Sequence, residues 1–300
     1  MTIPEEAFQK YIRAGRIAAQ IREQMRRTVS EGMRIIDVCE KAESLIRESN
    51  GKPAFPCNVS INEVAAHYSS PPQDKKTIPE NSIVKVDLGV HIDGYIADTA
   101  ATVCFNPEYE NLVRAAEEAL VTATKMLRPG LSVAKFGSAI QKAIQMRGLK
   151  PISNLTGHQI SRYSLHAGKA LPNVFHLSAS RLKEGEVYAV EPFVTVPKAA
   201  GKVKGAKEAY IFRFIKHKSL RNEHSKWLLN YVAKRFRTLP FSERWLEGCV
   251  PIGHYSAAFS ELLSSKSLTS YPVFVEVSGK PIAQAEHTVA ILENGCHVLT

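Results

Sequence analysis

A duplicated segment constrains the fold of this chain more than any other feature. The stretch EGMRIIDVCEKAESLIRESNGKP (31–53) aligns without gaps with PGLSVAKFGSAIQKAIQMRGLKP (129–151), and Gly32 then matches Gly130. Each copy has the pattern of a Gly-led turn, an amphipathic helix and a Lys-Pro stop. The match predicts two structurally related halves.

The sequence around the two copies extends the same plan. Another helical pattern precedes each copy, from Pro4 to about Arg27 and from Tyr109 to about Leu127. Strand-like sequence follows each copy: IVKVDLGV and YIADTAATVCF after the first, and VYAVEPFVTV after the second. We therefore expect a pseudo-symmetric α+β domain with helices outside and a curved mixed sheet inside.

The repeat plan is interrupted after Pro197. Residues 198–270 are mostly helical in pattern, and strand character returns at YPVFVEV and PIAQAEHTVAIL. We interpret 198–270 as an inserted basic subdomain whose three short helices and adjoining strands resemble a winged helix. Residues 1–197 and 271–300 would then form the core domain.

The net charge of +10 is concentrated in this insertion. Between Lys198 and Arg237, twelve Lys or Arg residues stand against two acids, Glu208 and Glu223. A solvated helical face is the ordinary interpretation of such a segment. The alternative is a binding surface for a polyanion such as RNA.

The remaining bulk features indicate a soluble, cytoplasmic protein. No apolar run approaches the roughly 18 residues of a membrane span, and the N-terminus MTIPEEAFQKYIRAG lacks the apolar region of a secretory signal. The five cysteines are scattered without a C-x-x-C pair, which is typical of reduced thiols. We expect no membrane contact.

The hairpin KVDLGVHIDGYIADTA places Asp87 and Asp98 among apolar neighbours. A four-residue loop HIDG would set the two aspartates directly opposite each other, whereas a two-residue Asp93-Gly94 turn would pair Asp98 with Gly89. Both registers leave both carboxylates on one face of the hairpin, because side chains along a strand alternate. Two such carboxylates repel, so they predict either a shared proton or a metal ion between them.

Other polar residues occupy similar surroundings. Glu191 ends the apolar strand VYAV, and Glu286 lies within the strand pattern PIAQAEHTVAIL, where glutamate is unusual. His158 and His166 can share a site only if the chain doubles back between them, and His67 ends a strand-like run. Each histidine alone is more often structural, but together these residues favour a common site.

Four carboxylates and one imidazole are the donors expected for two divalent ions such as Fe²⁺, Mn²⁺, Co²⁺ or Zn²⁺. Four negative charges neutralise two such ions, which removes the objection to burying the carboxylates. Two ions about 3.5–4 Å apart lower the pKa of a shared water towards neutrality. The donor set therefore predicts hydrolysis at neutral pH.

The stretches VDLGVHIDGYIADTAATV, GHQISRYSLHAGKALPN, VYAVEPF and AQAEHTV resemble the type II methionine aminopeptidases of peptidase family M24, which have the pita-bread fold. The likeness covers nearly the whole chain and includes the helical insertion that distinguishes type II from type I. Without a Lys-rich N-terminal extension, the chain is similar to the archaeal form. The resemblance implies a monomeric, metal-dependent exopeptidase that removes the N-terminal methionine of nascent polypeptides and prefers a small second residue.

The resemblance also implies a role for each metal-site residue. Asp87 would chelate one of two divalent ions (Co, Mn, Fe or Zn), and Asp98 and Glu286 would bridge both ions. His158 and Glu191 would complete the second position. Glu191 would in addition carry the proton from the attacking water to the leaving amine.

Substrate contacts are implied in the same way. His67 and His166 would flank the substrate at the scissile amide or its leaving nitrogen, and one or the other would stabilise the oxyanion. The free α-amino group would bind at a metal. Phe55, Leu165 and Tyr271 would line the pocket for the methionine side chain.

Two rival interpretations stay open at this point. An X-Pro peptidase would use the same five ligands, although such enzymes generally carry a large extra domain before the pita-bread unit. A non-catalytic pita-bread adaptor would instead bind nucleic acid through residues 198–237. The enzymatic and nucleic-acid functions would coexist if the basic segment held the enzyme near ribosomal RNA.

Overall fold

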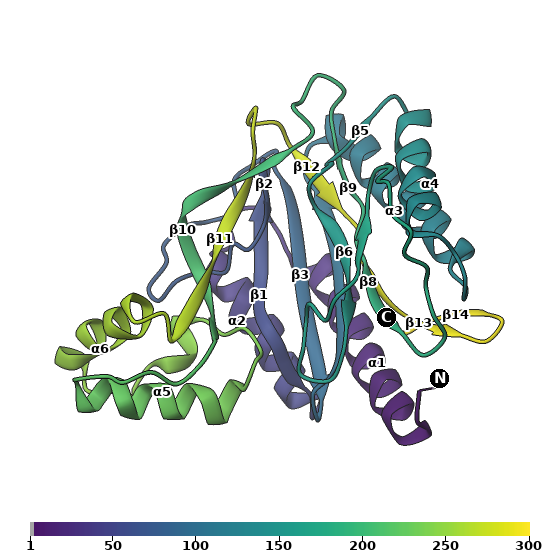
Figure 1. Ribbon diagram of the computed structural model, residues 1–300. Helices are drawn as coiled ribbons and strands as arrows, with labels where there is room; N and C mark the ends of the chain where they lie inside the picture. Colours follow the sequence, from purple (N-terminus) through teal and green to yellow (C-terminus); the bar gives the residue numbers. More distant parts are fainter. Residues whose placement is uncertain (1–2) are drawn as a thin grey trace.

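The computed structural model describes residues 3–300, so the first two residues of the predicted segment 1–197 lie outside the described residues. Figure 1 shows the arrangement of its helices and strands. In chain order the elements are α1 (Glu5–Thr28), α2 (Ile35–Glu48), β1 (Lys52–Ile61), β2 (Val64–Ala66), β3 (Ile83–Ile92), β4 (Tyr95–Cys104), η1 (Pro107–Tyr109), α3 (Glu110–Met126), α4 (Val133–Met146), β5 (Lys150–Pro151), β6 (Thr156–Ile160), β7 (Ala170–Pro172), β8 (Val187–Val190), β9 (Phe193–Thr195), β10 (Val203–Phe214), α5 (Glu223–Phe236), η2 (Glu243–Leu246), α6 (Ile252–Ser264), β11 (Leu268–Glu276), β12 (Ile282–Gln284), β13 (His287–Leu292) and β14 (Gly295–Val298).

The two predicted repeats are confirmed as equivalent helix pairs. Helices α2 and α4 both have 14 residues, and each follows a glycine with positive φ, Gly32 at 77° and Gly130 at 80°. These glycines adopt a conformation that other residues take only at a cost, so each can end the connection from the preceding helix in one tight turn. Helices α1 and α2 pack on β1, β3 and β4, while α3 and α4 pack on β5, β7, β9 and β12.

The strands of the two halves meet at one seam. Strands β1, β3 and β4 form one antiparallel sheet, and β14, β13, β8, β6 and β7 form another, in that order. A bridge between Ala100 at β4 and Glu286 next to β13 joins the two sheets, and the Glu286 N–H donates to the Ala100 carbonyl at 3.1 Å. The α+β architecture with helices outside and strands inside is therefore confirmed.

The hairpin of β3 and β4 has the second of the two predicted registers. Asp93 and Gly94 form the turn with φ of 50° and 89°, so Ile92 pairs with Tyr95 and Gly89 pairs with Asp98. Positive φ at both central residues is the geometry of a type I′ turn, which Asp-Gly sequences favour.

The strand predicted around Glu286 differs in detail from the structure. It is interrupted between β12 and β13, and Glu286 sits in the interruption instead of mid-strand. Glu191 lies between β8 and β9, directly before Pro192, which cannot donate a backbone hydrogen bond. Both glutamates thus occupy breaks in the regular ladders, where the backbone can turn a side chain towards the cavity.

The inserted region has an apolar core of its own. Buried residues of β10, α5, α6 and β11, among them Phe212, Leu228, Phe259 and Leu262, pack together with Phe241 from the segment between α5 and η2. The long antiparallel pair β10–β11 connects this region to the rest of the molecule, at the lower left in Figure 1. The boundaries 198–270 and the winged-helix likeness stay predictions.

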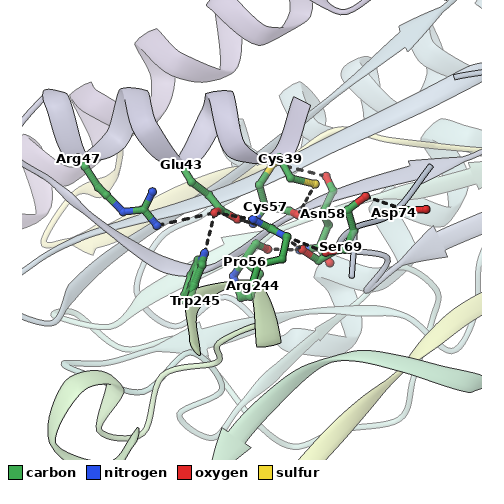
Figure 2. Close-up of polar contacts among 11 residues, drawn as sticks. Cys39, Glu43, Arg47, Pro56, Cys57, Asn58, Ser69, Asp74, Arg244 and Trp245 are labelled. Carbon is green, nitrogen blue, oxygen red and sulfur yellow. Dashed lines mark hydrogen bonds and ion pairs between the residues drawn. The ribbon is translucent and has the colours of Figure 1, made fainter. Parts of the chain in front are cut away.

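A buried ionic cluster fastens the inserted region to α2. The Arg244 guanidinium donates to both Glu43 carboxylate oxygens at 2.8 and 3.1 Å, and Trp245 Nε1 donates to the same carboxylate at 2.7 Å. Figure 2 shows Glu43 among Arg244, Trp245 and Arg47. Only 2% of the Glu43 side chain and 5% of the Arg244 side chain are exposed, so water cannot replace either partner.

No helix among residues 3–300 combines the length and the apolar character that a membrane crossing requires.

We predict that Glu43→Gln lowers the free energy of unfolding by about 3 kcal/mol, because it leaves the Arg244 guanidinium buried without a counter-charge. The matched control is Glu110→Gln, which removes the carboxylate of a surface pair with Arg114, and it should change stability little. Urea unfolding of both variants checks this. Equal, small losses would show that the buried pair contributes no more than the surface pair.

Candidate metal centre

Five side chains converge on one cavity at the seam between the sheets. Asp87 comes from β3, Asp98 from β4, His158 from β6, Glu191 from the break after β8, and Glu286 from the break before β13. The two halves of the molecule thus both supply side chains to the cavity. All five residues predicted as ligands line it.

Their polar atoms lie close together. His158 Nε2 is 3.6 Å from an Asp98 carboxylate oxygen and 3.5 Å from a Glu191 oxygen. One donor atom from each of Asp98, His158 and Glu286 can be chosen so that all three lie within 4.8 Å of one another. Oδ1 of Asp87 and Oδ1 of Asp98 are buried and have no hydrogen-bond partner in the described chain. Buried oxygens without a hydrogen-bond partner are rare unless an ion or water binds them.

The carboxylates hold protons more strongly than usual. Burial raises the pKa of Asp87 to about 7. Burial, together with the charges of neighbouring carboxylates, also raises the pKa values of Asp98, Glu191 and Glu286 well above the ordinary range. Asp87 and Glu191 reach the cavity with part of their surface, but the surrounding protein still desolvates them.

Burial has the opposite effect on the imidazole. It lowers the pKa of His158 to about 3, and the neighbouring His166 lowers it further in the same direction. His158 is therefore neutral near pH 7, which is the state in which an imidazole nitrogen can bind a metal.

Hydrogen bonds between the two sheets fix the backbone of Asp98 and Glu286. The Thr288 hydroxyl accepts from the Asp98 N–H at 2.7 Å and lies 2.8 Å from the Asp98 carbonyl, to which it donates. Thr99 Oγ1 donates to the Glu286 carbonyl at 2.8 Å and accepts from the Arg22 guanidinium of α1 at 2.6 Å. Such outer contacts hold metal ligands in place before an ion binds.

Gln284 is a residue that the sequence reasoning missed. Its Nε2 lies 3.4 Å from Glu191 Oε2 and 3.4 Å from Glu286 Oε2. The amide therefore orients two of the carboxylates. Its position two residues before Glu286, and so on the same side of the chain, was the available signal.

The two predicted substrate histidines stand at the same cavity. The chain between His158 and His166 does double back, and their ring centroids are 4.3 Å apart. His67 directly follows β2 with φ of 68°, and its Nδ1 lies 3.2 Å from the Pro272 carbonyl oxygen. The Tyr271 ring is 5.6 Å from the His67 ring and 6.5 Å from the His166 ring.

Apolar side chains complete the cavity. The predicted wall residues Phe55, Leu165 and Tyr271 all line it, together with two that the sequence reasoning missed, Ile211 and Pro240. The close approach of the Phe55 ring to β3 needs Gly89, since a Cβ on Gly89 would lie 2.3 Å from that ring.

The residues present fit divalent metal ions. They offer four carboxylates with raised pKa values and a neutral imidazole, and two of the carboxylates have oxygens without hydrogen-bond partners. Oxygen and imidazole donors suit divalent transition ions, and opposing charge offsets the cost of burying the acids.

The model of metallopeptidase family M24 matches residues 9–225 of this chain. A methionine aminopeptidase of Thermococcus onnurineus is 42% identical over 290 residues, which are 96% of this chain and 98% of the relative. Two solved structures share the fold at 22% identity: a thermophilic Arx1, with a TM-score of 0.85 over 99% of this chain and 91% of that one, and a methionine aminopeptidase of Thermotoga maritima, with a TM-score of 0.72 over 100% and 98%.

The family model covers well over half of the residues, and the curated relative is similar over nearly its full length. The fold is therefore the pita-bread fold of these neighbours, and the chain belongs to the methionine aminopeptidases of metallopeptidase family M24.

Proposed function

We propose that this protein removes the N-terminal methionine from nascent polypeptides by hydrolysis of the first peptide bond, with a preference for a small second residue. One observation carries the proposal: four carboxylates and a neutral imidazole share a cavity with an apolar wall of Phe55, Leu165 and Tyr271. The names of the relatives support the same activity.

The donor set supports two divalent ions of Co, Mn, Fe or Zn. Asp87 would hold one ion, Asp98 and Glu286 would contribute to both, and His158 and Glu191 would complete the other position. When bound, such ions polarise a carbonyl and lower the pKa of a water molecule.

The protein's own residues would move the proton. Glu191 faces His158 at 3.5 Å on one side and Gln284 at 3.4 Å on the other. A carboxylate in this place can take a proton from the attacking water at one oxygen and deliver it to the leaving nitrogen.

His67 and His166 would act differently on the substrate. Burial lowers the pKa of His67 to about 4, so the ring is neutral and carries one proton. Because Nδ1 faces the Pro272 carbonyl, that nitrogen holds the proton and Nε2 is left as an acceptor for the scissile amide N–H. His166 is then the ring that would donate to the developing oxyanion.

Three further expectations about this protein stay predictions: a monomeric state, a cytoplasmic location, and proximity to ribosomal RNA through residues 198–237.

The first test is release of methionine from a Met-Gly peptide by metal-stripped protein. We expect Mn²⁺ or Co²⁺ to restore turnover, and Asp98→Ala to lower it by about 100-fold or more, because it removes a proposed shared ligand. Asp37→Ala, which removes a carboxylate from the surface of α2, is the matched control. Faster cleavage of an Xaa-Pro peptide, or no turnover by folded protein with any metal, would contradict the proposal.

The proton-carrying role of Glu191 is tested by Glu191→Gln, which keeps a side-chain oxygen that can bind a metal ion but cannot take up a proton. Turnover should fall by about 10²- to 10⁴-fold while bound metal, measured by mass spectrometry, is retained. Glu117→Gln on α3 is the exposed control. Full turnover with full metal content in Glu191→Gln would exclude this role.

Metal binding should release protons, and more of them at pH 6 than at pH 8, because Asp87, with a pKa of about 7 in the metal-free protein, is mostly protonated only at the lower pH. Three further carboxyls with raised pKa values add to the release. The same four carboxyls hold more protons in the metal-free folded state than in the unfolded state from about pH 4 up to their raised pKa values. They therefore make the free energy of unfolding fall as pH rises through that range. The lowered pKa values of His67, His91, His158 and His287 act in the opposite direction.

Titration calorimetry in two buffers of different ionisation enthalpy measures the proton release directly. Absence of proton release at pH 6 would show that the carboxylates are already ionised without metal.

A further inference from the structure

A second concave surface lies between α2, β1 and the inserted region. It consists of two adjoining depressions of about 440 and 450 Å³ that share Lys52, His91, Tyr231, Arg235 and Phe236. We call this surface the α2–α5 groove. Figure 2 shows one end of it, where Arg47 and Trp245 flank the Glu43 cluster.

The groove carries an excess of positive charge. Lys52, Lys234, Arg235 and Arg237 line it, and within residues 3–300 none of these four is ion-paired with an acidic side chain. Unpaired charges of one sign along a concave surface reinforce each other's potential and attract anions.

Two acids also line the groove, and they do not cancel this charge. Glu43 is already held by the Arg244 guanidinium, with Arg47 at 3.7 Å, which leaves Glu40 as the remaining acid. The groove therefore keeps a net positive charge after its internal pairs are formed.

Aromatic rings line the groove beside its cations, and the Arg47 guanidinium lies over the Trp245 ring at 5.8 Å. Tyr231 and Phe236 come from α5 and Trp245 from η2, and all three are half-buried. The Phe236 and Trp245 centroids are 5.7 Å apart, and the indole is fixed by its 2.7 Å hydrogen bond to Glu43. Fixed rings beside a basic surface are the usual stacking platform for nucleotide bases.

Arg237 shows backbone strain at the edge of the groove. It follows the last residue of α5 with φ of 56° and ψ of −115°, which residues other than glycine rarely adopt. Its guanidinium lies over the Tyr163 ring at 4.4 Å. Strained residues are concentrated at functional sites, where the surrounding structure holds them in place.

We propose that the α2–α5 groove binds a nucleotide, with its phosphates against Arg47, Lys52 and Arg235 and its base against the ring of Tyr231 or Trp245. Each depression has a size within the range of about 300–1,000 Å³ that is typical of small-ligand sites. An acidic peptide would use the cations but leave the aromatic wall without a planar partner. The same chemistry occurs in a free nucleotide and in one residue of a single-stranded RNA.

The tryptophans give a direct assay. The chain has two, Trp227 and Trp245, so Trp227→Phe leaves Trp245 as the single reporter at the groove. Fluorescence of this metal-stripped variant is titrated with ADP, a single-stranded oligoadenylate, inorganic tripolyphosphate and a Glu-rich peptide. Because peptidase activity is not measured, failure of this test and failure of the proposed function are distinguishable.

We expect ADP or the oligoadenylate to change Trp245 fluorescence at concentrations at least tenfold below those of tripolyphosphate and the peptide. Arg235→Glu and, independently, Lys52→Glu should weaken nucleotide binding at least tenfold. Lys142→Glu, the same charge change at an exposed position of α4, should leave binding unaltered. Oligoadenylate binding more than tenfold tighter than ADP would identify the ligand as a strand, and similar binding would identify it as a free nucleotide.

Three results would overturn the proposal: tripolyphosphate binding as tightly as the nucleotides, preferential binding of the Glu-rich peptide, or equal weakening by Lys142→Glu. The first would reduce the groove to a non-specific polyanion surface, and the second would make it a peptide site. The third would show that net charge alone controls binding.

Discussion

Four carboxylates that face one another in a buried cavity are the constraint around which this molecule is arranged. Left ionised and without cations, Asp87, Asp98, Glu191 and Glu286 would repel one another at short range, and burial raises the pKa of each. The structure holds them there because each comes from a strand or strand break fixed by its own half of the sheet. The apolar packing of α1 to α4 against those strands offsets the free-energy cost of burying four carboxylates.

Hydrogen bonds between the two sheets hold the carboxylate-bearing residues in place. Thr288 ties Asp98 to β13, and Thr99 ties β4 to Glu286, so each half-sheet positions a carboxylate of the other. Arg22 extends the contact to α1 and adds a positive charge behind Glu286. The duplicated architecture therefore has a chemical consequence, because a site between the two halves receives polar side chains from both of them.

Much of this could be predicted from the sequence, because the signals were local. Alternation along the hairpin placed both aspartates on one face, although the choice between two registers depended on whether Asp93-Gly94 adopts positive φ at both residues. The doubling back between His158 and His166 was the condition for their sharing a site, and the structure meets it. Gln284 had a local signal too, its position two residues before Glu286. Pro240 could not be found in this way, since an ordinary residue acquires a role only when tertiary structure brings its segment to the cavity.

The inserted region lines two surfaces, the cavity and the α2–α5 groove. Pro240 lines both the cavity and the α2–α5 groove, and Leu239, which lines the groove, packs in the same cluster as Phe55 and Leu165 of the cavity wall. The Thr238 hydroxyl donates to the Tyr163 carbonyl, so the short segment after α5 is tied to the loop that carries Leu165. A ligand that fixed Arg237, the first residue of this segment, would therefore restrict the wall of the cavity, since two packed surfaces that share one chain segment cannot move independently.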